Sequence, residues 1–170
     1  SPLNPVSFAR KYYRGEMPLV NAAGQGTYRL KMFRLPWLLG AGSWFGWFYL
    51  DNIRNRKVIP QFGEGKNMME IIEVQDAVNL MVKIAFADEP RGIINIPSAG
   101  AISHEEFLGS VASFFNVKAV DYRQLYPGKI EKEALKAFTS NIMLGTKYPE
   151  LFGGFEYTSL EESFGFVHGL

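Results

Sequence analysis

The sequence predicts an α/β protein in which at least some strands pair in parallel. Short apolar segments that are typical of strands alternate along the chain with segments that are typical of helices. The clearest strands cover residues 28–37, 69–74 and 92–96, and a helix is expected after each of them. With 170 residues and 47% hydrophobic content, the chain can bury a core. We therefore expect residues 1–170 to form a single unit.

The most informative stretch is an apolar strand that leads into a glycine-rich aromatic loop. Pro36 is expected to end the strand, because proline cannot donate a hydrogen bond to a sheet. In many α/β proteins a loop of this kind holds a ligand, since the rigid sheet positions it. Aromatic side chains that suit an apolar or ring-shaped ligand fill the loop and the helix expected after it. They are Trp37, Trp44, Phe45 and Trp47.

Capping residues place the starts of three helices. Ser103 and Ser159 are each followed three residues later by a glutamate, which is the pattern of a capping box. Asp76 suits the N-cap of the helix that follows residues 69–74. Three other helices are expected over residues 8–23, 43–56 and 130–138, a strand over residues 117–122, and a short extended piece over residues 58–60.

The helix after Ser103 carries apolar residues at helical spacing. Phe107, Phe114 and Phe115 are therefore expected in the core. His104 lies inside the capping box, and we expect it to form a solvated helix start. The two histidines, His104 and His168, are too far apart in the sequence to predict a metal site.

Composition excludes several classes of protein. The net charge of +1, with acids and bases mixed along the chain, argues against a nucleic-acid binder. The absence of cysteine excludes disulfides, thiolate catalysis and Cys-ligated zinc, and it fits a cytoplasmic protein. The longest uncharged stretch, residues 35–50, is shorter than the roughly 20 residues that span a bilayer. We expect no membrane span and no secretory signal peptide.

Three of the charged residues within the predicted strands are candidates for a functional role. Arg34 lies in an apolar strand, and we favour a buried ion pair or a hydrogen bond to a chain end over contact with a ligand. Glu70 and Glu73 are three residues apart on one strand, so they would face opposite sides of the sheet. They make a poor acid–base pair.

Four segments occur in an order and spacing that resemble a known family. They are residues 2–7, residues 34–42, residues 62–67 with the following 71–77, and residues 94–96 with the following Ser103. Together they are similar to the C-terminal half of an extended short-chain dehydrogenase/reductase, a member of the NAD(P)-dependent epimerase/dehydratase family. The resemblance implies the last part of a Rossmann-type parallel sheet, within residues 1–42, and a small α/β substrate-binding domain, mainly within residues 43–170.

The resemblance also implies a function and a site. The chain would be the substrate-binding portion of an NAD(P)-dependent epimerase, dehydratase or reductase, acting on a small molecule that is apolar or sugar-like. The cofactor would be NAD or NADP. Three residues, Pro36, Trp37 and Leu38, would lie near the nicotinamide. Phe45, Asn67 and Met69 would lie toward the substrate.

The sequence departs from the family pattern in three ways. The catalytic tyrosine and lysine positions align with Phe8 and Tyr12, although Lys11 and Tyr13 are close by. No glycine-rich phosphate-binding motif follows a strand, so the main dinucleotide site is absent and the first half of the fold looks missing. Met69 stands where nucleotide-sugar enzymes of the family commonly have an arginine.

These departures leave two alternatives beside the enzyme. The chain could be a non-catalytic relative that binds a ligand or a protein after losing the tyrosine–lysine pair. It could also be a fragment whose uncovered sheet edge and apolar face drive self-association, which predicts a homo-oligomer.

Overall fold

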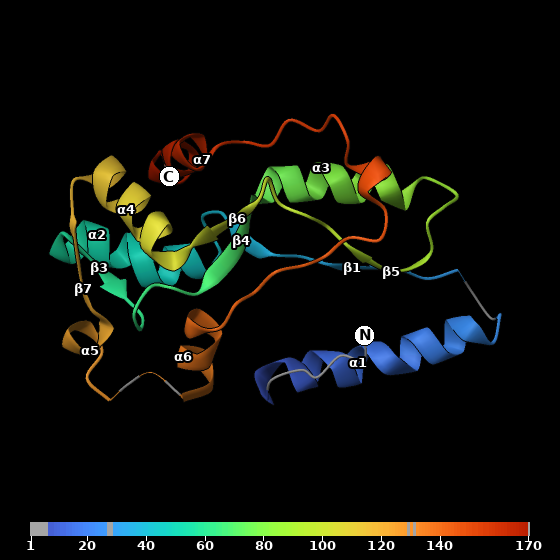
Figure 1. Ribbon diagram of the computed structural model, residues 1–170, viewed down its shortest axis with the longest axis horizontal. Coiled ribbons are helices and arrows are strands. Elements are labelled where there is room, and N and C mark those ends of the chain that lie inside the picture. Colours follow the sequence, from blue (N-terminus) through green and yellow to red (C-terminus); the bar gives the residue numbers. More distant parts are fainter. Residues whose placement is uncertain (1–6, 27–28, 129, 131, 170) are drawn as a thin grey trace.

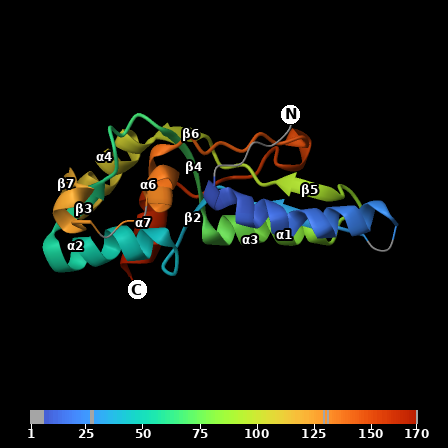
Figure 2. The ribbon, with the colours of Figure 1, turned by 90° about the horizontal axis from the view of Figure 1, so that it is seen from below.

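The structure is a computed structural model, and it describes residues 7–26, 29–128, 130 and 132–169. The elements form two groups at the two ends of an elongated molecule (Figure 1, Figure 2). One group contains α1 (Ser7–Gly24), β1 (Lys31–Arg34), α3 (Val74–Ala85) and β5 (Gly92–Asn95). Most of the motif expected over residues 2–7 lies outside the described residues.

In this first group β1 and β5 run parallel, with Lys31 opposite Gly92 and Arg34 opposite Asn95. Helix α1 lies on one side of this pair and α3 on the other (Figure 1). The Nζ atom of Lys31 donates a hydrogen bond of 2.6 Å to the carbonyl of Ile84 near the end of α3. Such carbonyls have no partner within the helix, so this contact ties α3 to the sheet. The predicted α/β architecture with parallel strands is confirmed.

The second group surrounds another parallel pair, β3 (Val58–Gln61) and β7 (Lys118–Asp121). The predicted extended piece over residues 58–60 and the strand over residues 117–122 correspond to these two strands. The surrounding helices are η1 (Gly46–Leu50), α2 (Asp51–Arg56), α4 (His104–Phe115), α5 (Tyr122–Leu125), α6 (Lys132–Thr139) and α7 (Leu160–His168). The short 3₁₀ helix η2 (Pro149–Leu151) packs instead beside α3, where the Nζ atom of Lys83 donates to the carbonyl of Leu151 at 3.3 Å.

A third sheet joins the two groups. Strand β4 (Met68–Glu73) pairs in parallel with β2 (Trp37–Leu39) and antiparallel with β6 (Ala101–Ser103). Residues three apart on a strand face opposite sides. Met69 accordingly packs into the core of the second group, and Ile72 packs into the core of the first. The sheet is therefore a wall shared by two hydrophobic cores.

The single strand predicted over residues 28–37 is wrong. Residues 27–28 lie outside the described part of the chain, and the rest forms two short strands, β1 and β2, on either side of Pro36. β1 pairs with β5, whereas β2 pairs with β4. Proline has no N–H to donate, so the chain changes sheets at this point instead of ending its strand.

The helix predicted over residues 43–56 is present but irregular. Trp44 and Phe45 begin it, residues 46–50 form a π-helical turn, and α2 completes it. A Cβ atom on Gly46 would lie 2.4 Å from the carbonyl oxygen of Ala41. Only glycine fits there without a shift in the backbone, so Gly46 lets the loop pack closely against this wider turn. Such turns are frequent at functional sites.

Both predicted capping boxes are confirmed. Ser103 caps α4 together with Glu106, and Ser159 caps α7 together with Glu162. Asp76 is not the cap of α3, contrary to the prediction: the carboxylate of Glu73 accepts the backbone N–H groups of Gln75 and Asp76.

The carboxylate of Asp76 has a different role. It accepts hydrogen bonds from the N–H of Thr158 at 2.7 Å and from its hydroxyl at 3.1 Å. Asp76 thus fixes the segment that leads into α7. An acid in the first turn of a helix can serve as a cap or bind another segment, and only the path of the chain decides which.

Two expectations about α4 are corrected. His104 is only 1% exposed instead of solvated, because Asn67 and Gly65 of the preceding glycine turn close over the start of the helix through their carbonyl oxygens. Phe107 is fully buried as predicted, but Phe114 is 42% exposed because it lies at the edge of the contact between α4 and α7.

Candidate functional site

An apolar cavity of about 450 Å³ opens at the carboxyl end of β1. Ligands in open α/β sheets bind outside the carboxyl ends of the strands, so this is the expected place for a site. The chain segment that crosses between the two sheets forms one wall, and the start of the irregular helix forms another. The lining residues are Leu35, Pro36, Trp37, Leu38, Ser43, Trp44 and Ile142.

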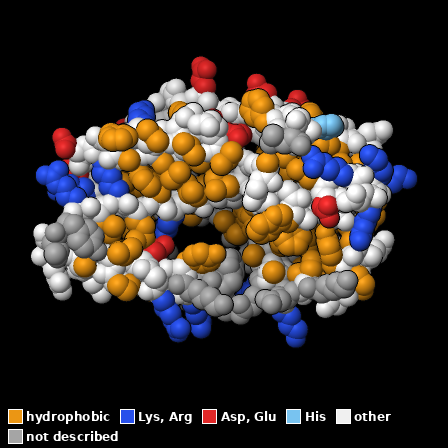
Figure 3. All heavy atoms as spheres, turned by 180° about the vertical axis from the view of Figure 1, so that it is seen from behind, with side chains coloured by type: hydrophobic (Ala, Val, Ile, Leu, Met, Phe, Trp, Pro, Cys, Tyr) orange, Lys and Arg blue, Asp and Glu red, His pale blue; other side chains and the backbone are white. Residues whose placement is uncertain are grey.

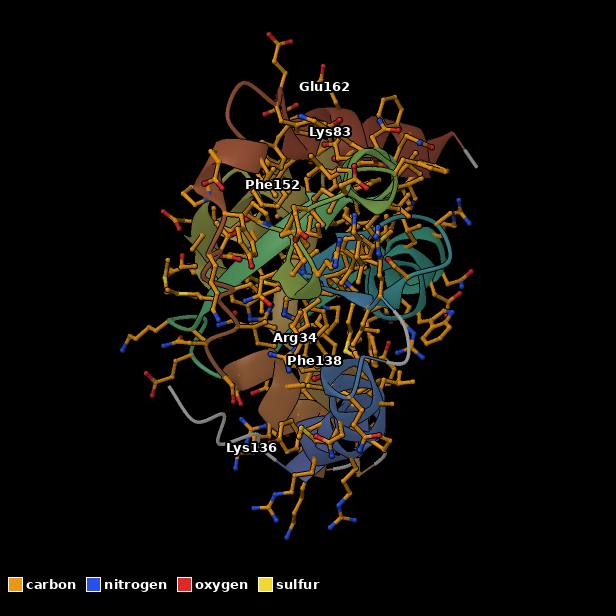
Figure 4. The ribbon with its side chains drawn as sticks, turned by 90° about the vertical axis from the view of Figure 1, so that its right-hand side faces the viewer. Arg34, Lys83, Lys136, Phe138, Phe152 and Glu162 are labelled. Atoms are coloured by element: carbon orange, nitrogen blue, oxygen red, sulfur yellow. The ribbon has the colours of Figure 1, made fainter. Side chains whose placement is uncertain are left out.

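Aromatic contacts hold the walls of the cavity. The ring of Trp37 meets Trp44 edge-on, with centroids 4.8 Å apart, and stacks on Phe138 of α6 at 5.2 Å. In Figure 4, Phe138 lies toward the interior of the molecule, whereas Lys136 of the same helix points away from it. The two tryptophan rings therefore have little freedom to reorient, and they present a firm apolar surface to the cavity.

Polar groups near the cavity are already engaged or covered. The hydroxyl of Ser43 donates to the carbonyl of Gly40 at 2.7 Å and accepts the N–H groups of Gly40 and Phe45, each at 3.2 Å. The indole N–H of Trp44 is buried and has no hydrogen-bond partner among the residues that the structure describes. The cavity therefore presents mainly carbon surface, which favours a flat or apolar group.

The three predicted cofactor residues are consecutive in the sequence, and the structure shows which cavity they face. Pro36, Trp37 and Leu38 all line the cavity, next to Leu35 and Trp44. They lie where the chain leaves β1, whose carboxyl end adjoins that of β5.

The three predicted substrate residues do not line this cavity. Phe45 is fully buried and stacks on Tyr49, with ring centroids 5.4 Å apart. Met69 is 3% exposed, in the wall between the two cores. Asn67 is half-buried, and its side chain donates to the carbonyl of Ser140 at 3.4 Å.

The positions that align with the catalytic tyrosine and lysine both fall on α1. Phe8 is within this helix, but its side chain lies outside the described part of the structure. Tyr12 is 71% exposed. The two strand glutamates hold the fold: Glu70 accepts the N–H of Leu144 at 3.0 Å, and Glu73 caps α3.

Arg34 forms the ion pair that we favoured from the sequence. Its guanidinium binds both carboxylate oxygens of Glu16, with one contact, from Nε to Oε1, of 3.1 Å. Only 21% of the arginine side chain and 18% of the glutamate side chain are exposed. The pair joins α1 to the end of β1 beside the cavity, so it fixes the site's position on the first group.

A buried histidine and tyrosine lie behind the aromatic wall. His104 Nε2 is 3.0 Å from the hydroxyl of Tyr49, and Trp44 meets the Tyr49 ring edge-on at 5.6 Å. Burial lowers the pKa of His104 to about 4, although the backbone of Phe62 acts in the opposite direction. Burial likewise raises the pKa of Tyr49 far above its ordinary value. Both groups are uncharged near neutral pH, which suits a structural contact.

A larger cavity, of about 740 Å³, lies at the opposite end of the same strands. It is bounded by the end of α1, and its lining includes Arg29, Arg91 and Lys147. Two of these cations already have acidic neighbours, Asp88 at 3.7 Å from Arg29 and Glu89 at 3.1 Å from Arg91. We favour the smaller cavity as the functional site, because it adjoins the carboxyl ends of the strands.

Two further classes of site find no support in the part of the chain that the structure describes. No group of histidine and acidic side chains there could hold a metal ion. None of the described helices is both long enough and apolar enough to cross a bilayer.

Comparisons with known proteins identify the fold. No family model matches the sequence, and no curated protein matches it. Among solved structures, DesIV, a dTDP-glucose 4,6-dehydratase from Streptomyces venezuelae with NAD bound, is similar at a TM-score of 0.74 and 14% identity. That likeness covers 99% of this chain and 52% of DesIV.

Two other solved structures have a similar fold. TunA, an NAD-dependent NDP-hexosamine 5,6-dehydratase, has a TM-score of 0.71 and 16% identity over 98% of this chain and 54% of its own. A UDP-N-acetylglucosamine 4-epimerase from Methanobrevibacter ruminantium has a TM-score of 0.65 and 14% identity. That likeness covers 98% of this chain and 56% of the epimerase.

This chain has the fold of about half of an NAD-dependent epimerase or dehydratase. At these identities the likeness concerns the fold, and the half-length coverage agrees with the resemblance to a C-terminal half that the sequence motifs indicated.

Sequence reasoning missed part of the site. Ile142 lines the cavity and Phe138 supports Trp37, yet both lie about 100 positions further along the chain. Residue 142 reaches the cavity because its backbone pairs with β4, where the N–H of Glu70 donates to the Ile142 carbonyl at 3.1 Å. No local pattern in the sequence signals a contact of this kind.

Proposed function

We propose that this chain is the substrate-binding portion of an NAD(P)-dependent epimerase, dehydratase or reductase that acts on a small molecule. The main observation in support is the apolar cavity at the carboxyl end of β1, with Pro36, Trp37 and Leu38 in its lining. Its carbon-rich walls fit a nicotinamide ring, and the cofactor, when bound, would supply hydride transfer. The comparisons support NAD, and we leave NADP as the alternative.

In this proposal the chain's own residues position and shield the reaction. Trp37 and Trp44 exclude water from the reacting end of the site, and the Arg34–Glu16 pair holds α1 against the strand below it. The division that we propose places residues 1–42 in the cofactor domain and residues 43–170 mainly in the substrate domain. The absence of cysteine suits a reducing compartment, so we propose the cytoplasm.

Nicotinamide fluorescence tests this function. NADH and NADPH are titrated into the full-length gene product and into its Trp37→Ala and Trp47→Ala variants. Trp47 is 72% exposed and lies outside the cavity lining, so it is the matched control. We expect one nucleotide to bind, and the Trp37 variant to weaken binding about tenfold while the Trp47 variant leaves it unchanged. If neither nucleotide binds, the proposed function is wrong.

A non-catalytic role is the second candidate. It is favoured by the exposed, uncharged Tyr12 at the position aligned with the catalytic lysine, and by Phe8 at the position aligned with the catalytic tyrosine. A tyrosine that exchanges protons with a substrate needs a lysine partner and a closed site. Nucleotide binding without turnover of any substrate in a panel of sugars and hydroxy compounds would support this role. Turnover that is lost on Tyr12→Phe would exclude it.

We also propose that the protein self-associates. An exposed apolar strip runs along α3 and onto the residue that caps its end, at Val74, Val78, Val82 and Phe86. Apolar side chains also gather over broad areas of the face shown in Figure 3. Such surfaces are commonly covered by another chain. Light scattering is the test, and a monomer at high concentration would exclude this assembly.

A further inference from the structure

The lining of the apolar cavity carries information about the substrate. Of the seven lining residues in the described part of the chain none is charged, and six have hydrocarbon or aromatic side chains. The seventh is Ser43, whose hydroxyl is already hydrogen-bonded to backbone groups of Gly40 and Phe45. A ligand that enters loses its water and gains almost no hydrogen bonds, which is costly for any polar or charged group.

The cationic residue that adjoins the lining segment in the chain cannot compensate for this. Arg34 precedes the lining segment directly, but both oxygens of Glu16 already hold its guanidinium. In a nucleotide sugar the diphosphate is attached directly to the sugar, so it would have to displace that half-buried pair and leave the Glu16 carboxylate without its partner. In a nicotinamide nucleotide a ribose separates the ring from the diphosphate, so the ring can reach the cavity while the diphosphate stays outside it. On α6, Lys136 points outward in Figure 4, away from Phe138.

The walls favour a flat, uncharged molecule. Trp37 is backed by Phe138 at 5.2 Å and flanked by Trp44 at 4.8 Å, so its indole ring is held in place as a stacking surface. The volume of about 450 Å³ lies within the range of pockets that bury most of a small organic ligand. The cavity thus has the size and surface for one fused or substituted ring system beside the nicotinamide ring that the proposed function places there.

We propose that the site takes an uncharged, predominantly apolar ring compound as its substrate, and that it does not take a nucleotide sugar. This inference rests on the proposed function, because it names the substrate class of the same site. It also separates this chain from solved proteins of the same fold, such as the UDP-N-acetylglucosamine 4-epimerase that was solved in complex with UDP-N-acetylmuramic acid.

Nuclear magnetic resonance of the indole N–H groups provides the test, because the chain has only three tryptophans. The ¹⁵N-labelled chain is titrated with 2-acetylnaphthalene, an uncharged ring ketone, and separately with UDP-glucose. We expect the ketone to shift the Trp37 and Trp44 signals and leave that of Trp47 in place. UDP-glucose should shift none of the three at millimolar concentration.

Substitutions locate the binding. Trp37→Leu should weaken ketone binding at least tenfold, whereas Trp47→Leu, the exposed control, should change it less than twofold. If Trp37→Leu does not fold, Ile142→Ala replaces it as the test, because it widens the cavity from another wall. Ile142→Ala should weaken ketone binding about threefold. Equal losses in the Trp37 and Trp47 variants, or no ketone binding up to its solubility limit, would overturn the proposal.

The two proposals can fail separately. Ketone binding in a protein that binds neither NADH nor NADPH would leave the ligand class standing and remove the proposed function. Suppose instead that nucleotide binding depends on Trp37 and that UDP-glucose shifts the Trp37 signal at lower concentration than the ketone does. That result would leave the proposed function standing and overturn the proposed ligand class.

Discussion

The two cores of the molecule differ in the chemistry of their side chains. The core of the second group is built largely from stacked rings, among them Phe45, Tyr49, Phe62 and Phe107. The core of the first group is mainly aliphatic, with Ile72, Leu80 and Ile94 among its buried residues, and it has a single buried ring, that of Phe152, among the described residues.

The difference matters because the cavity lies where the two cores meet. Its Leu35 and Leu38 pack against the aliphatic core, and Trp37 and Trp44 pack against the aromatic one. Rings interact through preferred angles as well as through buried area, so they hold a site in a fixed shape. Branched aliphatic chains fill the space between sheet and helix with fewer demands on angle. The aromatic core therefore shapes the site, and the aliphatic core supports the sheet beneath it.

The comparison is sharpest when one large residue is removed from each core. Phe107→Ala should lower the free energy of unfolding by about 4 kcal/mol, because the ring is fully buried among other rings. Leu80→Ala, in the aliphatic core, should cost about 3 kcal/mol. Urea denaturation followed by circular dichroism measures both.

Because β4 is common to both cores, each variant should still unfold in one transition. Two separate transitions would show that the cores are independent, contrary to the shared wall seen here.

Acid should weaken the aromatic core selectively, through His104. Its pKa is about 4 in the fold against 6.5 in the unfolded chain, so the folded form stays neutral while the unfolded form binds a proton. The full stability is present above pH 6.5 and is lost as the pH falls toward 4. The loss should reach about 3 kcal/mol, since each pKa unit corresponds to about 1.4 kcal/mol.

The measurement is the free energy of unfolding at pH 7 and pH 4.5. His104→Gln should remove most of this pH dependence, and His168→Gln, at an exposed position of α7, should preserve it. Identical pH profiles for the wild type and the His104 variant would contradict the assignment.

The smallest of the three effects concerns the ion pair beside the cavity. Arg34→Met should cost about 2 kcal/mol, because the pair is only partly buried and the Glu16 carboxylate would lose its partner. The control is Arg123→Met: Arg123 is ion-paired with Asp121, but its side chain is 74% exposed, so its loss should lower the stability less than that of Arg34 does. Thermal denaturation measures the stability of both variants. Equal losses of stability would show that burial does not strengthen the Arg34–Glu16 pair.

Local signals in the sequence were reliable where short-range physics decides the structure. The two capping boxes formed as predicted, because a serine and a glutamate three residues later satisfy each other's backbone groups without outside help. The alternation of strands and helices, the parallel pairing and the ion-paired state of Arg34 were also predictable from the residues, although its partner Glu16 lies on another element.

The remaining features depended on contacts between distant segments. Glu73 and Asp76 are both acids near the start of α3. Glu73 caps the helix and Asp76 binds Thr158, and this difference depends on the position of Thr158, which is distant in the sequence. His104 is buried because the Tyr49 hydroxyl and the glycine turn contact it. Pro36 lies at a change of sheet because β1 pairs with β5 whereas β2 pairs with β4.

By itself, the sequence determined the order and type of the elements and the segment that forms the site. The tertiary structure alone decided the two cores, the placement of Phe138 and Ile142 at the cavity, and the burial of Phe45 and Met69 away from it. The physical reason is range: caps and periodicity act over a few residues, whereas a cavity's shape is set by whichever side chains packing brings together from anywhere in the chain.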